Sequence, residues 1–418
     1  MKAGYAEIDI TPEEPLFLAG FAEPKGRLGE SIDSPLIAQA LLLEDAEEHK
    51  LLLLAFDSVA CDAEWAEHVC QTVAQNLSIP RKSVFINVSH THCAPQIRLN
   101  LSIPAALEYR NSLQSTLIEL ATTAANTVRP AKFALTEAIN SQVTCRRRWS
   151  PEGWLNAPNP QLEPVRQTPM LDITWDDGDR LLVPTVAGHP TTASDPVYDS
   201  HYHGILRQLF APQAKILVLS GFSGDSKMTT PDRQTQSWIR DRKTDVRIIA
   251  HRLAADLMES FQYLEPVTLS LASFSTSGEL PRWENAPAQM PPEEAENHLA
   301  AYLANPSLPI PSSTPPVPFY ASIHKITKDH FWVALSGEVC GGYAEILQDT
   351  LSKILPEKSF AFIGYCHCAS GYIPTAKILF EGGYEGKNSF APKPPLHPSS
   401  EKIVANLVDQ CAKHFHKT

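Results

Sequence analysis

Hydrophobic residues recur along the chain in two patterns, one helical and one extended. Residues 63–77, 108–128 and 403–412 carry apolar side chains three or four positions apart, which predicts helices with one buried face. Shorter, nearly continuous apolar runs predict strands buried on both faces, at residues 51–56, 83–88, 181–187, 215–219, 331–335 and 360–364. Strands interleaved with helices predict an α/β fold of mixed sheets layered with helices.

A proline-rich segment, residues 281–318, interrupts this pattern. It predicts a long irregular connection with a short helix near 294–303, which serves either as an inter-domain linker or as a loop at the mouth of a pocket. We predict that residues 1–418 form a single large hydrolase domain that contains this connection.

Composition and charge exclude several classes of protein. Of 418 residues, 43% are hydrophobic, enough for a sizeable core, and the formal net charge is −12. The most basic stretch, Arg146-Arg147-Arg148, is only three residues long, and such a short run on an acidic chain argues against general nucleic-acid binding. No apolar run approaches the roughly 20 residues of a membrane span. We therefore expect a cytoplasmic protein without a transmembrane segment, with secretion as the alternative if a signal has been removed.

Polar residues follow the predicted strands where each one ends. The motifs at these ends are Asp57, Ser89-His90-Thr91-His92, Gly188-His189-Pro190-Thr191-Thr192, Ser220–Ser226, Ser336-Gly337-Glu338 and Cys366-His367-Cys368. Open α/β sheets bind ligands just beyond the carboxyl ends of their strands. The set of motifs therefore predicts one assembled site, although polar residues also begin wherever strands simply reach the surface.

The pair His90 and His92 gives the sharpest chemical signal. In an extended backbone these two side chains face the same way and enter one pocket. His189 is a plausible third nitrogen ligand and Glu338 a plausible oxygen ligand. Two nitrogens, a carboxylate and one open position are typical of catalytic zinc. A lone His-x-His is also common among surface and core histidines.

Other motifs leave alternatives open. Cys366-His367-Cys368 is too tightly spaced for a usual zinc knuckle. His201-Tyr202-His203 lines the same pocket, holds a second cation, or belongs to a solvated loop. The segment 221–226 lacks the G-x-S-x-G pattern, so a serine hydrolase that uses Ser223 or Ser226 has weak support.

Several motifs, taken in order, resemble the N-terminal catalytic domain of the neutral/alkaline, non-lysosomal ceramidase family. The resemblance spans residues 3–390 and rests on AEIDITP (6–12), LAGF (18–21), SHTHCAP (89–95), GHPTT (188–192), SGE (336–338), GYIPT (371–375) and GGYE (382–385). It implies the fold of that domain, without the family's C-terminal immunoglobulin-like domain. Ordered recurrence makes it more specific than any single motif.

The resemblance also implies roles for individual residues. The implied zinc ligands are His90, His189, Glu338 and Tyr372. His92 would be a supporting or catalytic histidine that faces the scissile carbonyl, and Tyr384 would stabilise the developing oxyanion. Arg146 would contact the substrate, and Gly20 would approach it with its backbone amide.

The chain departs from the family around the pocket. Lys227 stands where the family places a functional serine, with Ser226 one residue early. His201 replaces an acidic residue, and the arginine motif reads Cys145-Arg146-Arg147-Arg148. These changes favour a small-molecule substrate other than membrane ceramide, with Arg146, Arg147, His201 or His203 contacting its polar or anionic part. Ser226 is a further expected substrate contact.

The sequence therefore predicts a zinc-dependent hydrolase that cleaves the amide bond of an N-acylated substrate. One alternative is a zinc-dependent esterase or lactonase that acts on a polar or sugar-like substrate. Another is a non-catalytic, metal-containing binding protein. The sequence predicts no nucleic-acid partner, and it leaves the oligomeric state open.

Overall fold

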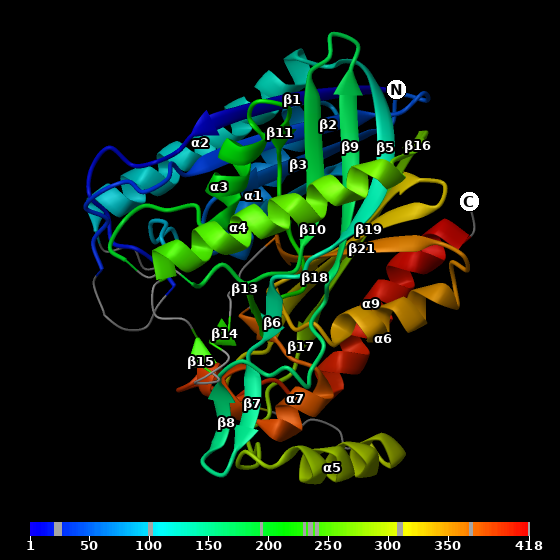
Figure 1. The fold of residues 1–418 in the computed structure, drawn as a ribbon. Helices are drawn as coiled ribbons and strands as arrows, with labels where there is room; N and C mark the ends of the chain where they lie inside the picture. The colour runs from blue at the N-terminus through cyan, green and yellow to red at the C-terminus, as the bar shows by residue number, and fades with distance from the viewer. Residues whose placement is uncertain are drawn as a thin grey trace.

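Strands dominate the fold, and most of them belong to one large mixed sheet (Figure 1). The computed structural model describes residues 1–20, 27–98, 103–192, 195–228, 231–232, 237–238, 242–306, 312–367 and 371–416. Within these residues the sheet has 14 strands, and 12 of them follow one path: β11 (Lys215–Ile216), β10 (Arg180–Val186), β9 (Gln167–Trp175), β5 (Arg129–Ile139), β1 (Lys2–Asp9), β2 (Ile37–Glu44), β3 (Lys50–Phe56), β4 (Val84–Val88), β21 (Ser359–Cys366), β19 (His330–Ser336), β18 (Val317–Thr327) and β17 (Leu269–Leu280). β12 (Leu219–Ser220) and β16 (Glu265–Val267) pair with β10 and β5.

Strand pairing is both parallel and antiparallel. β3 with β4 and β19 with β21 are parallel pairs, whereas β1 with β2 and β17 with β18 are antiparallel. The predicted mixed α/β class is therefore confirmed. Among the described residues, four short two-stranded ladders lie outside the main sheet: β6 (Val143–Cys145) with β13 (Ser226–Met228), β7 (Arg147–Ser150) with β8 (Gly153–Asn156), β14 (Pro231–Asp232) with β15 (Ser237–Trp238), and β20 (Glu338–Val339) with β22 (Tyr372–Ile373).

The sheet curves around a shared apolar interior. Leu51 and Leu53 of β3 join a cluster that also collects side chains from β9, β10, β18, β19 and β21, including Trp332. Leu52 and Leu54 point the other way, into a cluster shared with two helices. Because both faces of these strands are covered, the strands need continuous apolar sequence, as the pattern predicted.

Helices cover the outer faces of the sheet. α1 (Ala63–Asn76) and α2 (Pro104–Asn126) pack beside β1 to β4, and α3 (Tyr202–Phe210) and α4 (Arg242–Glu259) beside β9 and β10. α6 (Tyr343–Ser352) and α9 (Ser399–His416) pack on β17 to β19 (Figure 1). The three helices predicted by apolar spacing correspond to α1, α2 and α9. None of the helices in the described part of the chain has the length and apolar character that a membrane span requires.

The proline-rich connection joins neighbouring strands of one sheet. β17 ends at Leu280 and β18, its antiparallel partner, begins at Val317. The predicted short helix is α5 (Pro292–Ala304), and residues 307–311 lie outside the described residues. The connection packs against the segment that carries α7 (Ala376–Glu381) and α8 (Gly383–Gly386), through hydrogen bonds such as Met290 N to Glu381 O (3.2 Å). The remaining short helical turns are η1 (Arg81–Ser83), η2 (Ser260–Tyr263) and η3 (Asn388–Phe390).

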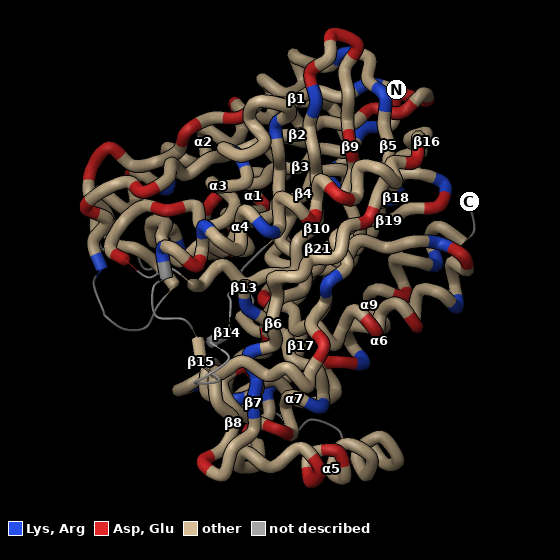
Figure 2. Tube along the Cα trace, viewed as in Figure 1, with Lys and Arg blue, Asp and Glu red and all other residues tan. Residues whose placement is uncertain are grey.

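Charged residues are distributed over the whole fold. Figure 2 shows Lys and Arg positions interspersed with Asp and Glu positions along the trace. The arginines of β7 lie beside acidic residues near α7 in the same view, and Arg147 forms an ion pair with Glu381 (2.9 Å). Two arginines of the basic run, Arg146 and Arg147, are therefore paired with acidic residues inside the protein.

Candidate metal centre

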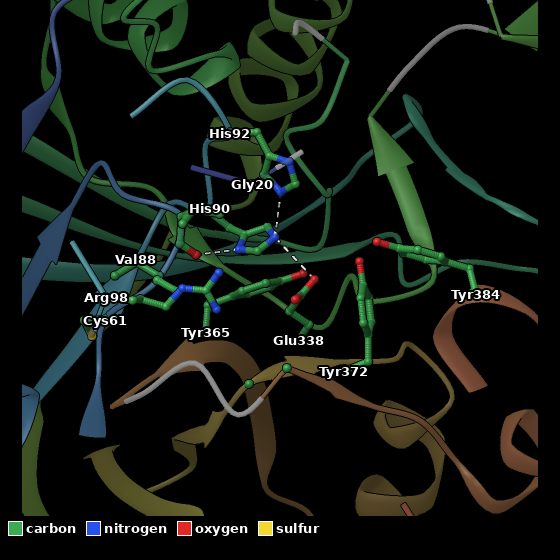
Figure 3. A pocket seen from close by; sticks show the side chains of 14 residues that line it. Gly20, Cys61, Val88, His90, His92, Arg98, Glu338, Tyr365, Tyr372 and Tyr384 are labelled. Atoms are coloured by element: carbon green, nitrogen blue, oxygen red, sulfur yellow. Dashed lines mark hydrogen bonds and ion pairs between the residues drawn. The ribbon is translucent and has the colours of Figure 1, made fainter. Parts of the chain in front are cut away.

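A cavity of about 80 Å³ lies where the ends of β4 and β21 meet β20 and β22. Six of the predicted site residues line it: Gly20, His90, His92, Glu338, Tyr372 and Tyr384. Figure 3 shows the side chains of the other five directed toward one another across the cavity, with Gly20 beside His92. The ring of His189 adjoins this group, with its centroid 4.6 Å from that of His90. Strand ends far apart in the sequence therefore bring His90, His92 and Glu338 to one cavity, whereas Asp57, Ser220–Asp225 and Cys366-His367 are not among the described residues that line it.

His90 and His92 converge, but by a different backbone geometry from the one expected. Their Nε2 atoms are 3.2 Å apart (Figure 3). His90 has φ +61°, a left-handed conformation that is uncommon for a residue with a side chain. The pair therefore does not follow the alternation of an extended strand, and that part of the sequence argument is wrong. Strain of this kind is concentrated at functional sites in proteins.

Backbone carbonyls orient two of the histidines. The Nδ1 atom of His90 lies 2.6 Å from the carbonyl oxygen of Val59, and Nδ1 of His189 lies 3.3 Å from that of Ser223. A carbonyl oxygen only accepts hydrogen bonds, so we place the proton on Nδ1 in both rings. Each Nε2 then presents a lone pair, the arrangement typical of metal-ligating histidine.

Glu338 and Tyr372 are placed by strand register. They are direct partners in the parallel ladder of β20 with β22, so their side chains leave the backbone side by side. Burial alone raises the pKa of Glu338, but His90, Arg146 and a hydrogen bond from Tyr372 outweigh it and lower the pKa overall. Glu338 is therefore a carboxylate at neutral pH.

The donor atoms around the cavity fit a metal ion. Ligand atoms of His90, His92 and His189 all lie within 4.8 Å of one another. Glu338 Oε2 lies 3.3 Å from His90 Nε2 and 3.7 Å from His189 Nε2. Neither His189 Nε2 nor Glu338 Oε2 has a hydrogen-bond partner among the described residues. Buried lone pairs that face one another are unfavourable alone, and a cation between them removes the conflict.

Arg146 and Arg147 were expected to contact the substrate, but both lie outside the cavity. Arg146 is 3% exposed and donates to Glu385 Oε1 (2.8 Å), Gly224 O (2.7 Å) and the Tyr372 hydroxyl (2.8 Å). Arg147 donates to Glu385 and, at 2.9 Å, to Glu381. Neither arginine lines the cavity, because each guanidinium group is enclosed by these internal partners. Direct substrate contact by either is therefore not supported, and Arg146 instead positions Tyr372.

His201 and Ser226, two other predicted substrate contacts, also lie outside the cavity lining. His201 is 1% exposed, and its Nε2 accepts a hydrogen bond from the backbone of Thr192 (3.2 Å). This hydrogen bond stabilises the backbone of the loop that follows His189. Ser226 is 3% exposed and pairs with Cys145 in the ladder of β13 with β6. Burial in these contacts keeps both side chains from a ligand in the cavity.

The remaining candidates from the sequence are also buried. Ser223 Oγ is 3.0 Å from the hydroxyl of Tyr365 and is 1% exposed, which disfavours it as a serine nucleophile. His203 stacks on Tyr202, with ring centroids 4.2 Å apart. His367 Nε2 lies 3.3 Å from Ser322 Oγ. Cys368, from the motif that contains His367, lies outside the described residues.

Sequence reasoning missed several residues that shape the site. Tyr365 lines the cavity and lies 3.2 Å from His189 Nδ1 through its hydroxyl. Arg27 donates to the carbonyl oxygens of His92 (2.7 Å) and Ala19 (2.9 Å) and thereby fixes the histidine loop. Arg98 also lines the cavity. Glu385, which binds Arg146 and Arg147, could have been found from the sequence because it follows Tyr384 in the GGYE motif. Tyr365, Arg27 and Arg98 lie outside the family motifs.

The fold and the site together define a mixed α/β protein with a buried histidine group compatible with a metal. A crystal structure of neutral ceramidase from Pseudomonas aeruginosa matches this chain with a TM-score of 0.77 and 15% identity, over 100% of this chain and 74% of that one. A structure of a ceramidase complexed with C2 matches with a TM-score of 0.76 and 13% identity, over 100% and 75%. No family model and no curated protein sequence matches the chain. The chain has a neutral-ceramidase-like fold, which confirms the predicted resemblance.

Proposed function

We propose that this protein is a zinc-dependent hydrolase that cleaves the amide bond of an N-acylated small molecule. The observation that carries the proposal is the convergence of His90 Nε2, His189 Nε2 and Glu338 Oε2, whose lone pairs face one another. These residues and the Tyr372 hydroxyl would hold the ion. A zinc ion bound there supplies Lewis acidity, which polarises a carbonyl group and makes water more acidic.

Other residues supply proton transfer and charge stabilisation. Burial, with a smaller contribution from the positive charge of Arg146, lowers the pKa of His92 well below its usual value, so His92 is neutral at pH 7. A neutral imidazole beside the reacting carbonyl accepts a proton from water and returns it to the leaving amine. Tyr384 lines the cavity, is 47% exposed and donates toward the developing oxyanion in this scheme.

Arg146 keeps this arrangement in place without contacting the substrate. Its hydrogen bond fixes the Tyr372 hydroxyl, and its ion pair with Glu385 anchors α8, which carries Tyr384. Burial raises the pKa of Tyr372 well above its usual value, although Arg146 opposes that shift. The protonated hydroxyl therefore donates to Glu338 while it accepts from Arg146.

The test is hydrolysis of a panel of N-acyl amides and matched esters by zinc-loaded protein, with and without a chelator. We expect amide turnover that chelation abolishes and added zinc restores. His92→Gln should lower kcat by about a hundredfold or more while zinc remains bound. His330→Gln, a substitution of a buried histidine remote from the cavity lining, is the matched control. Activity that survives chelation, or labelling of Ser223 by a fluorophosphonate, would refute the proposal.

A further inference from the structure

In the described part of the chain, four arginines lie in or near the cavity, and three of them are bonded to internal partners. Arg146 and Arg147 share the carboxylate of Glu385. Arg27 donates to the carbonyl oxygens of Ala19, His92 and, at 3.2 Å, Asp195. Their positive charges and hydrogen-bond donors therefore serve the protein itself, and a ligand in the cavity does not reach them.

Arg98 differs from these three arginines. It is partly exposed and lines the cavity, and among the described residues of the lining it is the one with a fixed positive charge. No hydrogen bond or ion pair links its guanidinium group to any residue in the described part of the chain; only its backbone nitrogen is bonded, to Gln96 Oε1 (3.3 Å). Figure 3 shows the guanidinium end directed from the Cys61 and Val88 side into the cavity, toward Tyr365 and the histidine group.

A guanidinium group in this place has a specific use. It presents paired donors in a rigid plane that matches a carboxylate with two parallel hydrogen bonds. Val59, Ala60 and Val88 line the same wall and offer no competing charge. Beside apolar side chains a charge-assisted hydrogen bond is stronger than the same bond in bulk water. A single guanidinium also balances one carboxylate charge, whereas a phosphate dianion would keep a second charge unbalanced.

We propose that Arg98 binds a carboxylate of the substrate, so that the substrate class is an N-acylated compound with a free carboxylate, such as an N-acyl amino acid. This inference rests on the proposed amide hydrolysis and assigns it a specificity determinant. The carboxylate would anchor one end of the substrate at Arg98, while the scissile amide lies toward His90, His92 and Glu338. No residue predicted from the sequence has this role, because Arg146 and Arg147 are enclosed.

The test compares N-acetyl-leucine with N-acetyl-leucinamide, which differ only in the carboxylate. Zinc-loaded wild type, Arg98→Gln, Arg98→Lys and Arg247→Gln are assayed for affinity by calorimetry and for turnover by acetate release. Arg247 is exposed on α4 and is the matched control. We expect wild type to prefer the carboxylate by about tenfold or more in affinity and in kcat/KM. Arg98→Gln should reduce that preference to about one, Arg98→Lys should restore part of it, and Arg247→Gln should keep it.

The outcomes separate this inference from the proposed function. Two results overturn the role of Arg98. One is wild-type protein that binds both compounds equally or binds neither; the other is an Arg98→Gln variant that keeps the preference for the carboxylate. An Arg98→Gln variant that keeps the preference would indicate that the substrate carboxylate binds the metal instead. If Arg98 governs carboxylate affinity but neither compound releases acetate, the anion site stands and amide hydrolysis fails. Tighter binding of the N-acetylated phosphonate analogue of leucine than of N-acetyl-leucine would overturn the carboxylate assignment in favour of a phosphate-like ligand.

Discussion

Gly20 controls where the His92 ring lies, and its substitution by alanine should disable catalysis without removing the metal. A Cβ atom at position 20 would lie 2.3 Å from Cγ and 2.5 Å from Nδ1 of His92, whereas ordinary van der Waals contact begins near 3.4 Å. The ring must therefore retreat by about 1 Å. A misplacement of this size in an active site costs on the order of a hundredfold in rate.

The assay needs a control for backbone strain, because Gly20 has φ +99° and alanine is disfavoured there. Gly178 provides it: its φ is +95°, and an added Cβ meets nothing within 4 Å. Both variants should lose roughly 1 kcal/mol of stability from strain. Only Gly20→Ala should lose kcat/KM by about a hundredfold, while both variants retain zinc. Equal activity of the two variants would refute the claim that this contact places His92.

Two further predictions concern stability, each followed by urea denaturation. Glu385→Gln should lower the free energy of unfolding by about 3–5 kcal/mol, because it leaves Arg146 and Arg147 with buried, unbalanced charge. Glu296→Gln, which removes an exposed ion pair with Lys377, is the control that should leave stability nearly unchanged, and equal losses would contradict the account. Burial lowers the pKa of His324 to about 3 and those of His330 and His367 to about 4. The unfolded chain then takes up protons that the folded protein excludes, so stability is full above about pH 6.5 and falls toward pH 4, by roughly 4 kcal/mol per pH unit for three histidines. His324→Asn should reduce that slope by about 1.4 kcal/mol per pH unit, the contribution of one histidine, and stability that is flat between pH 6.5 and 4.5 would contradict the assignment.

The part of the site that could be predicted from the sequence follows from strand ends. His90, His189 and Glu338 each come directly after a predicted buried strand, so sheet geometry alone brings them to one edge. Tyr372, by contrast, was implied only by the resemblance, and its position depends on the register of β20 with β22. Local pattern thus predicts which strand ends carry chemistry, but not which residues become direct neighbours.

The roles of the arginines depend on contacts between distant parts of the chain. Arg146 and Arg147 form a basic run locally, and nothing nearby shows that Glu381 and Glu385, more than 230 residues away, neutralise it. Conversely, Arg98 follows the histidine motif without any feature that marks it, and only the folded cavity distinguishes it. The curvature of the sheet around one apolar cluster is likewise a long-range property, because it requires pairing between strands distant in sequence.

The central claim is that His90, His189 and Glu338 form a metal centre, and elemental analysis of the purified protein tests it most directly. Wild type, His90→Ala, Glu338→Ala and the control His330→Ala are incubated with zinc, dialysed and checked for native folding by circular dichroism. The account predicts about one zinc per chain in wild type and in the control, and loss of that zinc in both site variants. Folded wild type that binds no zinc, or site variants that keep it, would contradict the account.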